Sequence, residues 1–238
     1  MPLNFKRAHK ASHSPGAILS VLLLALLTYL LGWSSLFSLK QVVIHGTTQV
    51  PLIQKSLEQT SPKITMGEPL ARVDVKAIGR SIASNEWISA AEVGRSWLHG
   101  SLTIYVVERV PVAAFTNSQG VIYYFDSRGN DFRSPISYPK IPSIQLSHED
   151  RASKVAISSI LQFLPQNIFA RVENFSVKSA EDIEMTVVKS SKATFVVKWG
   201  SATDLTLKLG ILNKIENLKE NSHATVFDLS DPLSPIAK

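Results

Sequence analysis

Residues 86–115 read EWISAAEVGRSWLHGSLTIYVVERVPVAAF, and the first two thirds of this stretch decide the fold. Two apolar runs, 87–95 and 101–109, are separated by WLHG at 97–100, which suits a short connection between antiparallel strands. In the second run apolar side chains recur at every other position, so one face of that strand is predicted to be buried. The residues that we expect in this core are Trp87, Val93, Leu102, Ile104 and Val106.

The residues before this hairpin predict one strand and two helices. Residues 39–44 are rich in β-branched side chains and end at His45-Gly46, which is a turn signal. Segments 50–57 and 75–82 carry apolar residues at helical spacing, and Asp74 suits the N-cap of the second helix. The order strand, helix, helix, strand, strand is therefore predicted for residues 38–109.

An uncharged apolar segment near the N-terminus predicts a transmembrane helix at residues 17–37. A helix of this length measures about 31 Å, close to the thickness of the hydrocarbon core of a bilayer. Lys6, Arg7 and Lys10 precede the segment, so the positive-inside rule places residues 1–16 in the cytoplasm and residues 38–238 outside. A cleaved signal peptide has a similar layout, but the long run and the poor cleavage site at its end favour an uncleaved anchor.

Residues 110–238 predict a second, mainly β domain with flanking helices. Short strands are expected around the turn NSQG at 117–120, and further strands at 175–177, 183–188, 195–199 and 225–229. Helices are expected at about 151–164 and 204–218. The predicted class is α+β, with a single transmembrane helix, a domain of the order β-α-α-β-β, and this second domain.

Several of these stretches resemble the FtsQ/DivIB family of bacterial cell-division proteins along nearly the whole chain. FSLKQVVIHGTTQV at 37–50 is similar to the family's opening strand and turn, and VIYYFDSRGNDF at 121–132 to its strand followed by Asp-x-x-Gly. VKWG, LKLGILNKI and FDLSDP resemble its closing strand, helix and strand. Its Glu-Arg-x-Pro-x-Ala signature is matched by Glu108, Arg109, Pro111 and Ala113. The resemblance implies that residues 38–109 form a POTRA (polypeptide-transport-associated) domain.

The composition and the motifs give no indication of catalysis. The 238 residues include no cysteine, which excludes disulfides, thiolate metal sites and cysteine nucleophiles. Half of the net charge of +6 comes from the N-terminal tail, and the remaining lysines are scattered among acids, which argues against nucleic-acid binding. The one Ser-x-x-Lys match, 137–140, contains Pro139, which is unsuited to the helical turn that this motif requires. We therefore expect no catalytic residue, no metal site and no cofactor.

The resemblance implies a scaffold of the division complex at the septum, held in the cytoplasmic membrane by one span. It implies partners of the FtsB/FtsL type, short coiled-coil membrane proteins, bound by the last part of the second domain, and other division proteins are possible partners of the POTRA-type domain. A membrane-anchored envelope enzyme or receptor with an unrecognised site is the alternative.

The candidate partner site is the strand at 225–229 with its tail and the neighbouring strand at 195–199. Nothing obvious in the sequence covers the outer edge of strand 225–229, and an open edge can accept a strand from a partner. The alternative is that Val226 and Phe227 fill the core and that the tail is disordered. The candidate site residues are Phe195, Val197, Trp199, Thr225, Val226, Phe227, Asp228, Leu229, Ser230, Asp231 and Pro232.

Overall fold

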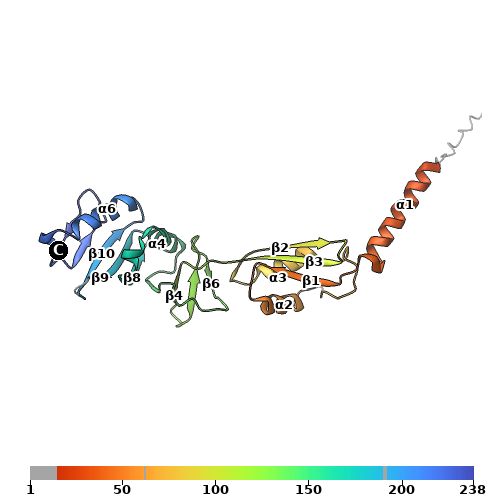
Figure 1. The fold of residues 1–238 in the computed structure, drawn as a ribbon, viewed down its shortest axis with the longest axis horizontal. Coiled ribbons are helices and arrows are strands. Elements are labelled where there is room, and N and C mark those ends of the chain that lie inside the picture. The colour runs from red at the N-terminus through yellow and green to blue at the C-terminus, as the bar shows by residue number, and fades with distance from the viewer. Residues whose placement is uncertain (1–14, 62, 190–191) are drawn as a thin grey trace, which may run out of the picture. The chain divides into compact units, whose positions relative to one another are not determined.

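The computed structural model describes residues 15–61, 63–189 and 192–238. The chain divides into two compact units, Met1–Glu108 and Arg109–Lys238 (Figure 1). The α+β class predicted from the sequence is confirmed, whereas the predicted boundaries of the individual domains stay predictions. Lys6, Arg7 and Lys10 lie outside the described residues.

The first unit begins with the apolar helix α1, Pro15–Gly32. Within the described residues it is the one helix long and apolar enough to cross a membrane, which is consistent with a single-pass anchor. The sequence predicted a continuous helix to Phe37, but the chain leaves the α-helix at Gly32 and forms a short 3-10 helix, η1, at Ser35–Phe37. Glycine is a poor helix former, and the Ser34 hydroxyl accepts a hydrogen bond from the Leu36 N–H, which starts the new turn.

The rest of this unit is a three-stranded sheet with two helices. In chain order the elements are β1 (Gln41–His45), α2 (Val50–Glu58), α3 (Val75–Ala83), β2 (Ile88–Ser96) and β3 (Ser101–Glu108). The strands lie in the order β1-β3-β2, with β1 parallel and β2 antiparallel to β3. The predicted order β-α-α-β-β is therefore confirmed, as is the Asp74 cap, whose carboxylate accepts from the N–H groups of Lys76 and Ala77.

The alternation in β3 places the core as the sequence predicted. Leu102, Ile104 and Val106 are buried, and Tyr105 between them is exposed. Trp87 is also buried, whereas Val93 is half-buried under α3. Gly46 after β1 has φ +86°, and a Cβ there would lie 2.0 Å from the Val106 carbonyl oxygen, so this turn requires glycine.

The second unit contains a small and a large sheet. Strands β4 (Ala113–Thr116), β5 (Ile122–Phe125) and β6 (Asp131–Phe132) form a three-stranded antiparallel sheet. The large sheet has six strands in the order β12-β11-β10-β9-β8-β7. In chain order its strands are β7 (Ile144–Leu146), β8 (Val172–Ser179), β9 (Asp182–Val188), β10 (Thr194–Gly200), β11 (Val226–Asp228) and β12 (Ile236–Ala237).

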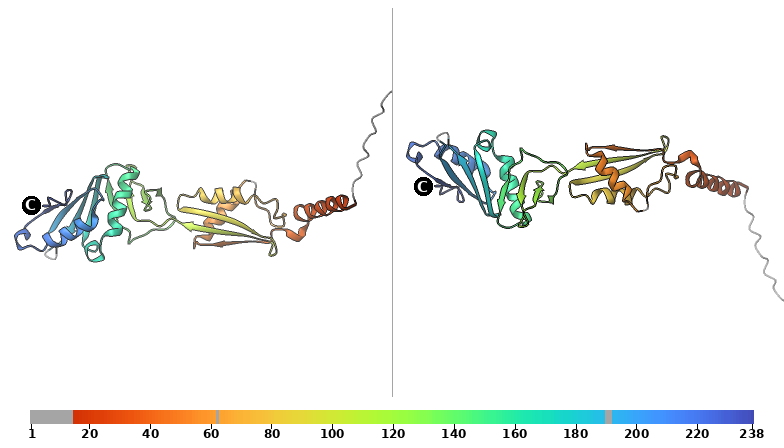
Figure 2. Two further views of the ribbon diagram at one scale, coloured as in Figure 1. Left: turned by 90° about the horizontal axis from the view of Figure 1, so that it is seen from above. Right: turned by 90° about the horizontal axis from the view of Figure 1, so that it is seen from below.

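Helices cover one face of the large sheet (Figure 2). They are α4 (Arg151–Phe163), α5 (Gln166–Phe169) and α6 (Leu205–Ile215), and a 3-10 helix, η2, follows at Lys219–Asn221. Side chains alternate along β9 and β10, and those on the helix side, such as Met185, Val187 and Val197, are fully buried. One apolar core therefore joins the sheet to the helices.

Candidate partner-binding edge

Five of the candidate partner residues belong to the core of the second unit. They lie on β10, on β11 or directly after β11, and all are buried: Phe195, Val197, Trp199, Phe227 and Leu229. The rings of Phe195 and Phe227 pack edge to face with centroids 5.1 Å apart. These buried side chains hold β11 to the sheet and are not exposed to a partner. Phe227 therefore fills the core, as the alternative interpretation of the sequence predicted.

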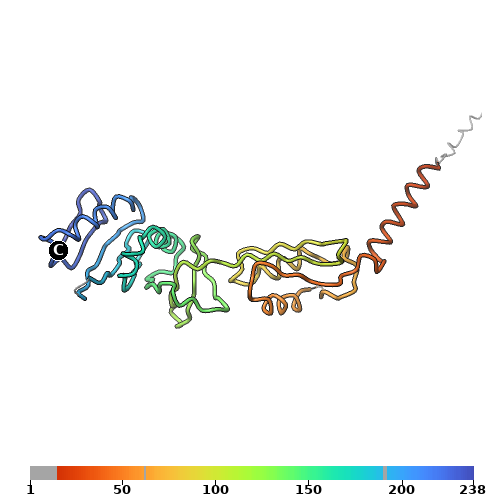
Figure 3. Tube along the Cα trace, in the orientation of Figure 1, coloured from red at the N-terminus to blue at the C-terminus, as the bar shows by residue number. Residues whose placement is uncertain are grey.

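The outer edge of β11 is covered, contrary to the expectation from the sequence. After β11 the chain turns back and adds β12, antiparallel to β11, with Phe227 opposite Ala237 and Asp228 opposite Ile236 (Figure 3). The Thr225 N–H donates to the Lys238 carbonyl, and the Val226 and Lys238 backbones exchange two hydrogen bonds of 2.9 Å each. The terminal strand of the sheet at this side is therefore β12.

The ladder geometry shows which main-chain groups of β12 point outward. In an antiparallel pair, hydrogen-bonded and non-hydrogen-bonded residue pairs alternate. Val226 and Lys238 form a hydrogen-bonded pair, so the next pair, Phe227 and Ala237, is non-hydrogen-bonded. The N–H and C=O of Ala237 therefore point away from β11, and no strand of the described residues pairs with this edge.

Two aspartates shape the connection between β11 and β12. Asp228 accepts a hydrogen bond from the Ser230 N–H at 3.0 Å, and Asp231 accepts one from the Leu233 N–H at 2.9 Å. Burial raises the pKa of Asp228, but its hydrogen bonds with Ser230 and the charges of Lys198 and Lys238 outweigh this and leave the pKa below its ordinary value. Thr225, Ser230 and Asp231 are exposed beside this connection, whereas Val226, Asp228 and Pro232 are half-buried.

Two apolar side chains next to the open edge were not among the candidates. Leu233, in the connection, is 85% exposed, and Ile236, on β12, is 46% exposed. They lie close in sequence to Ala237, whose outward backbone can form main-chain hydrogen bonds. We call Leu233, Ile236 and Ala237 the terminal edge.

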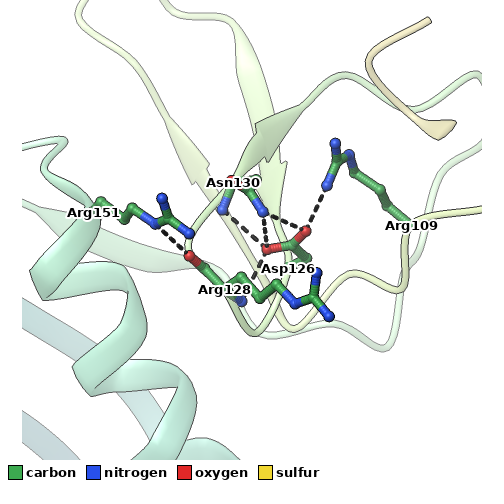
Figure 4. A network of polar contacts seen from close by, with 5 residues as sticks. All are labelled: Arg109, Asp126, Arg128, Asn130 and Arg151. Carbon is green, nitrogen blue, oxygen red and sulfur yellow. Dashed lines mark hydrogen bonds and ion pairs between the residues drawn. The ribbon is translucent and has the colours of Figure 1, made fainter. Parts of the chain in front are cut away.

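A second polar site lies where the second unit begins (Figure 4). The Arg109 guanidinium donates to Asp126 Oδ2 at 2.7 Å, and Asp126 Oδ1 accepts from the N–H groups of Arg128 and Asn130 at 2.9 and 3.0 Å. The side-chain amide of Asn130 also donates to both carboxylate oxygens. Burial raises the pKa of Asp126, but these hydrogen bonds outweigh it, so the pKa lies below its ordinary value.

This network fixes a turn to a helix and offers no reactive group. Arg151 Nε on α4 donates to the Arg128 carbonyl at 2.8 Å, and Gly129 has φ +73°, where a Cβ would lie 2.9 Å from the Arg151 carbonyl oxygen. Elsewhere, Ser137 and Lys140 lie in a loop outside any helix. Among the described residues, no three His, Cys, Asp or Glu side chains are grouped to hold a metal ion.

Comparison with known proteins identifies one domain and several similar proteins. Residues 37–109 match the family model for a POTRA domain, FtsQ-type. The chain is 27% identical over 231 residues to the cell division protein FtsQ of Mycobacteroides abscessus, covering 93% of the chain and 69% of that relative. Residues 37–109 are therefore a POTRA domain of the FtsQ type, and the chain is similar to FtsQ cell division proteins over most of its length.

Two further FtsQ proteins align with smaller parts of the chain. FtsQ of Geotalea daltonii is 26% identical over 155 residues, or 60% of this chain and 52% of the relative. FtsQ of Geobacter sp. is 28% identical over 143 residues, or 56% of this chain and 49% of the relative. The chain thus spans about half the length of these two relatives.

In this chain the two sequence motifs that resemble FtsQ meet in one place. Arg109 comes from the Glu-Arg-x-Pro signature and Asp126 from the Asp-x-x-Gly turn, and the structure joins them by an ion pair. In the sequence the two motifs are separate, and neither alone predicts the pair. The opposite charges of Arg109 and Asp126 were the signal in the sequence that could have indicated this ion pair.

Proposed function

We propose that this chain is a non-enzymatic, single-pass scaffold of the division complex, and that its terminal edge binds a small membrane protein of the FtsB/FtsL type at the septum. The observation that supports this is the outward-facing backbone of Ala237 on the last strand of a six-stranded sheet. A strand added at such an edge gains affinity from main-chain hydrogen bonds and specificity from side-chain contacts, without any catalytic group.

The partner contact is formed by the terminal edge in place of β11. Leu233 and Ile236 supply exposed apolar side chains beside the strand that the partner would extend. An apolar side chain buried by a partner contributes on the order of 1.5–3 kcal/mol relative to exposure. Unprotected edges favour unwanted pairing, and β12 limits this risk because it is only two residues long.

A single substitution tests this proposal. Proline at position 237 removes an N–H that points away from β11, so the internal ladder keeps its bonds. We expect Ala237→Pro to weaken capture of a co-expressed FtsB/FtsL-type partner from detergent-solubilised membranes, with little change in the melting temperature. Ala237→Ser keeps the N–H and is the matched control, which should bind like the unchanged protein.

Two outcomes would contradict the proposal. Equal binding by the Pro and Ser variants would place the partner site elsewhere. A large fall in melting temperature with Ala237→Pro would show that this N–H serves the fold instead of a partner.

We also propose that α1 is an uncleaved anchor, with residues 1–16 in the cytoplasm and residues 38–238 outside. The apolar length of α1 and the preceding Lys6, Arg7 and Lys10 support this orientation. Protease added to spheroplasts should digest the exterior part and leave a protected N-terminal fragment. A mature N-terminus near Ser35 would show that the segment is a signal peptide.

A further inference from the structure

The end of the POTRA domain where the chain enters from η1 carries large apolar side chains in solvent. Leu98 is 90% exposed, Leu36 66%, Met66 61% and Trp97 37%. We call these four residues the juxtamembrane tip. Scattered single apolar residues on a surface are ordinary, but a group of large ones at one end of a domain marks an interaction site.

Three separate segments are tied together at this tip. The rings of Phe37 and Trp97 lie edge to face with centroids 6.3 Å apart, which joins η1 to the β2–β3 turn. The Lys40 N–H donates to the Gly100 carbonyl at 2.7 Å, on the same turn. The Gly67 N–H donates to the Leu39 carbonyl at 2.8 Å, which brings the loop of Met66 to the same end. In Figure 1 the β2–β3 turn lies at the end of the sheet that follows η1.

The tip is close to the membrane anchor along the chain. Phe37 lies five positions after Gly32, the last residue of α1, and five residues span at most about 18 Å. The Arg72 guanidinium also lies 4.6 Å from the centroid of the Trp33 indole, directly after α1. The headgroup layer on each side of a bilayer is about 5–8 Å thick, so the tip lies within reach of it.

Basic side chains slightly outnumber acidic ones around the tip. Lys40 is exposed beside Gly100 and Arg72 is exposed beside Trp33, while Arg95 on β2 binds the Leu70 and Val73 carbonyls; the acids of this end are the half-buried Glu68 and the exposed Asp74. Apolar side chains surrounded by lysine and arginine are typical of surfaces that bind in the plane of a membrane. Trp97 has the amphipathic ring that favours the membrane–water boundary.

We propose that the juxtamembrane tip is a second membrane contact, in which Trp97 and Leu98 insert into the headgroup layer of the outer leaflet. This contact would fix the POTRA domain against the bilayer, in addition to the tether through α1. The inference rests on the proposed anchoring by α1, and it concerns a lipid surface instead of a protein partner.

The chain has no cysteine, so single cysteines can carry a fluorescent probe without competing labels. The full chain, labelled with nitrobenzoxadiazole at Leu98→Cys, is reconstituted into liposomes of phosphatidylethanolamine and phosphatidylglycerol. Nitroxide-bearing phospholipids are included as quenchers. The matched control is Thr48→Cys, an exposed position at the opposite end of the same domain, where the adjacent Thr47 hydroxyl binds Glu108 at the far end of β3.

We expect the fluorescence of the probe at position 98 to shift to the blue and to be quenched by the nitroxide lipids. The probe at position 48 should show neither effect. A probe at Leu24→Cys in α1 tests the anchor separately and should be quenched in every preparation. Quenching at position 24 with equal, water-like emission at positions 98 and 48 would overturn the inference and leave the anchor intact. Absence of quenching at position 24 would overturn both. Shielding of position 98 only when a division partner is co-reconstituted would show that the tip binds protein, and would also overturn the inference.

Discussion

The ion pair between Arg109 and Asp126 gives a quantitative prediction for the variant Asp126→Asn. If the new amide keeps its oxygen at the Oδ1 position, the bonds from the backbone N–H groups of Arg128 and Asn130 survive. Its NH₂ group then replaces Oδ2 and faces donors of Arg109 and Asn130. The variant loses a charge-assisted hydrogen bond worth about 1.5–3 kcal/mol.

Because Asp126 and Arg109 are both mostly buried, solvent replaces this bond only in part. We expect Asp126→Asn to lower the free energy of opening of β4, β5 and β6 by about 2–3 kcal/mol. Hydrogen exchange of the full chain in nanodiscs, read on peptides from residues 113–132, measures this directly. Arg128→Ala is the control, since it keeps the backbone N–H and should change exchange little.

The same variant has a defined pH dependence. The folded pKa of Asp126 lies below the ordinary value of 3.8, so its carboxylate stabilises the fold fully above that value. This stability is lost as the pH falls through the lowered folded pKa. The difference between the unchanged protein and Asp126→Asn should therefore be constant near neutrality and shrink below about pH 4. A difference below half a kcal/mol at neutral pH would refute the assigned role of the pair.

Two further predictions concern the POTRA domain, and both are measured by urea unfolding of the full chain. Ile104→Ala should lower the free energy of unfolding by about 2–5 kcal/mol because it leaves a cavity in the core. Tyr105→Ala, on the exposed face of the same strand, should lower it far less. Equal losses for the two variants would show that the strand register is wrong. Gly46→Ala should destabilise the domain strongly because the new Cβ would overlap the Val106 carbonyl oxygen. Gly67 has a similar φ of +88°, but no atom lies within 4 Å of its Cβ position, so Gly67→Ala should cost only about 1 kcal/mol. Comparable costs would mean that the backbone moves to relieve the overlap at position 46.

The sequence predicted the POTRA domain well because its signals are local and mutually consistent. The alternation at Leu102, Ile104 and Val106 follows from the strand period, and Gly46 and Asp74 mark the turn and the cap by their own chemistry. The end of α1 was less well predicted because hydropathy does not distinguish an α-helix from the 3-10 turn that follows Gly32.

The sequence did not predict β12, the strand that covers the outer edge of β11, because β12 has almost no sequence signal. Two residues, Ile236 and Ala237, are too short to show a period of two, and their pairing is non-local. The turns made by Asp228 and Asp231 return the chain to the sheet, and each aspartate alone indicates only a turn. The burial of Phe195 and Trp199 was predictable from their alternation in an apolar strand, which is more typical of a core than of a surface.

Binding of the partner at the terminal edge is tested most directly by site-specific photocrosslinking in dividing cells. A photoreactive phenylalanine is placed at Ile236, on β12, and separately at Gln145, an exposed residue on β7 at the opposite edge of the same sheet. We predict a crosslink from position 236 to a small single-span division protein of the FtsB/FtsL type and none from position 145. Crosslinks to that protein from position 145 alone, or equally from both positions, would contradict binding at the terminal edge.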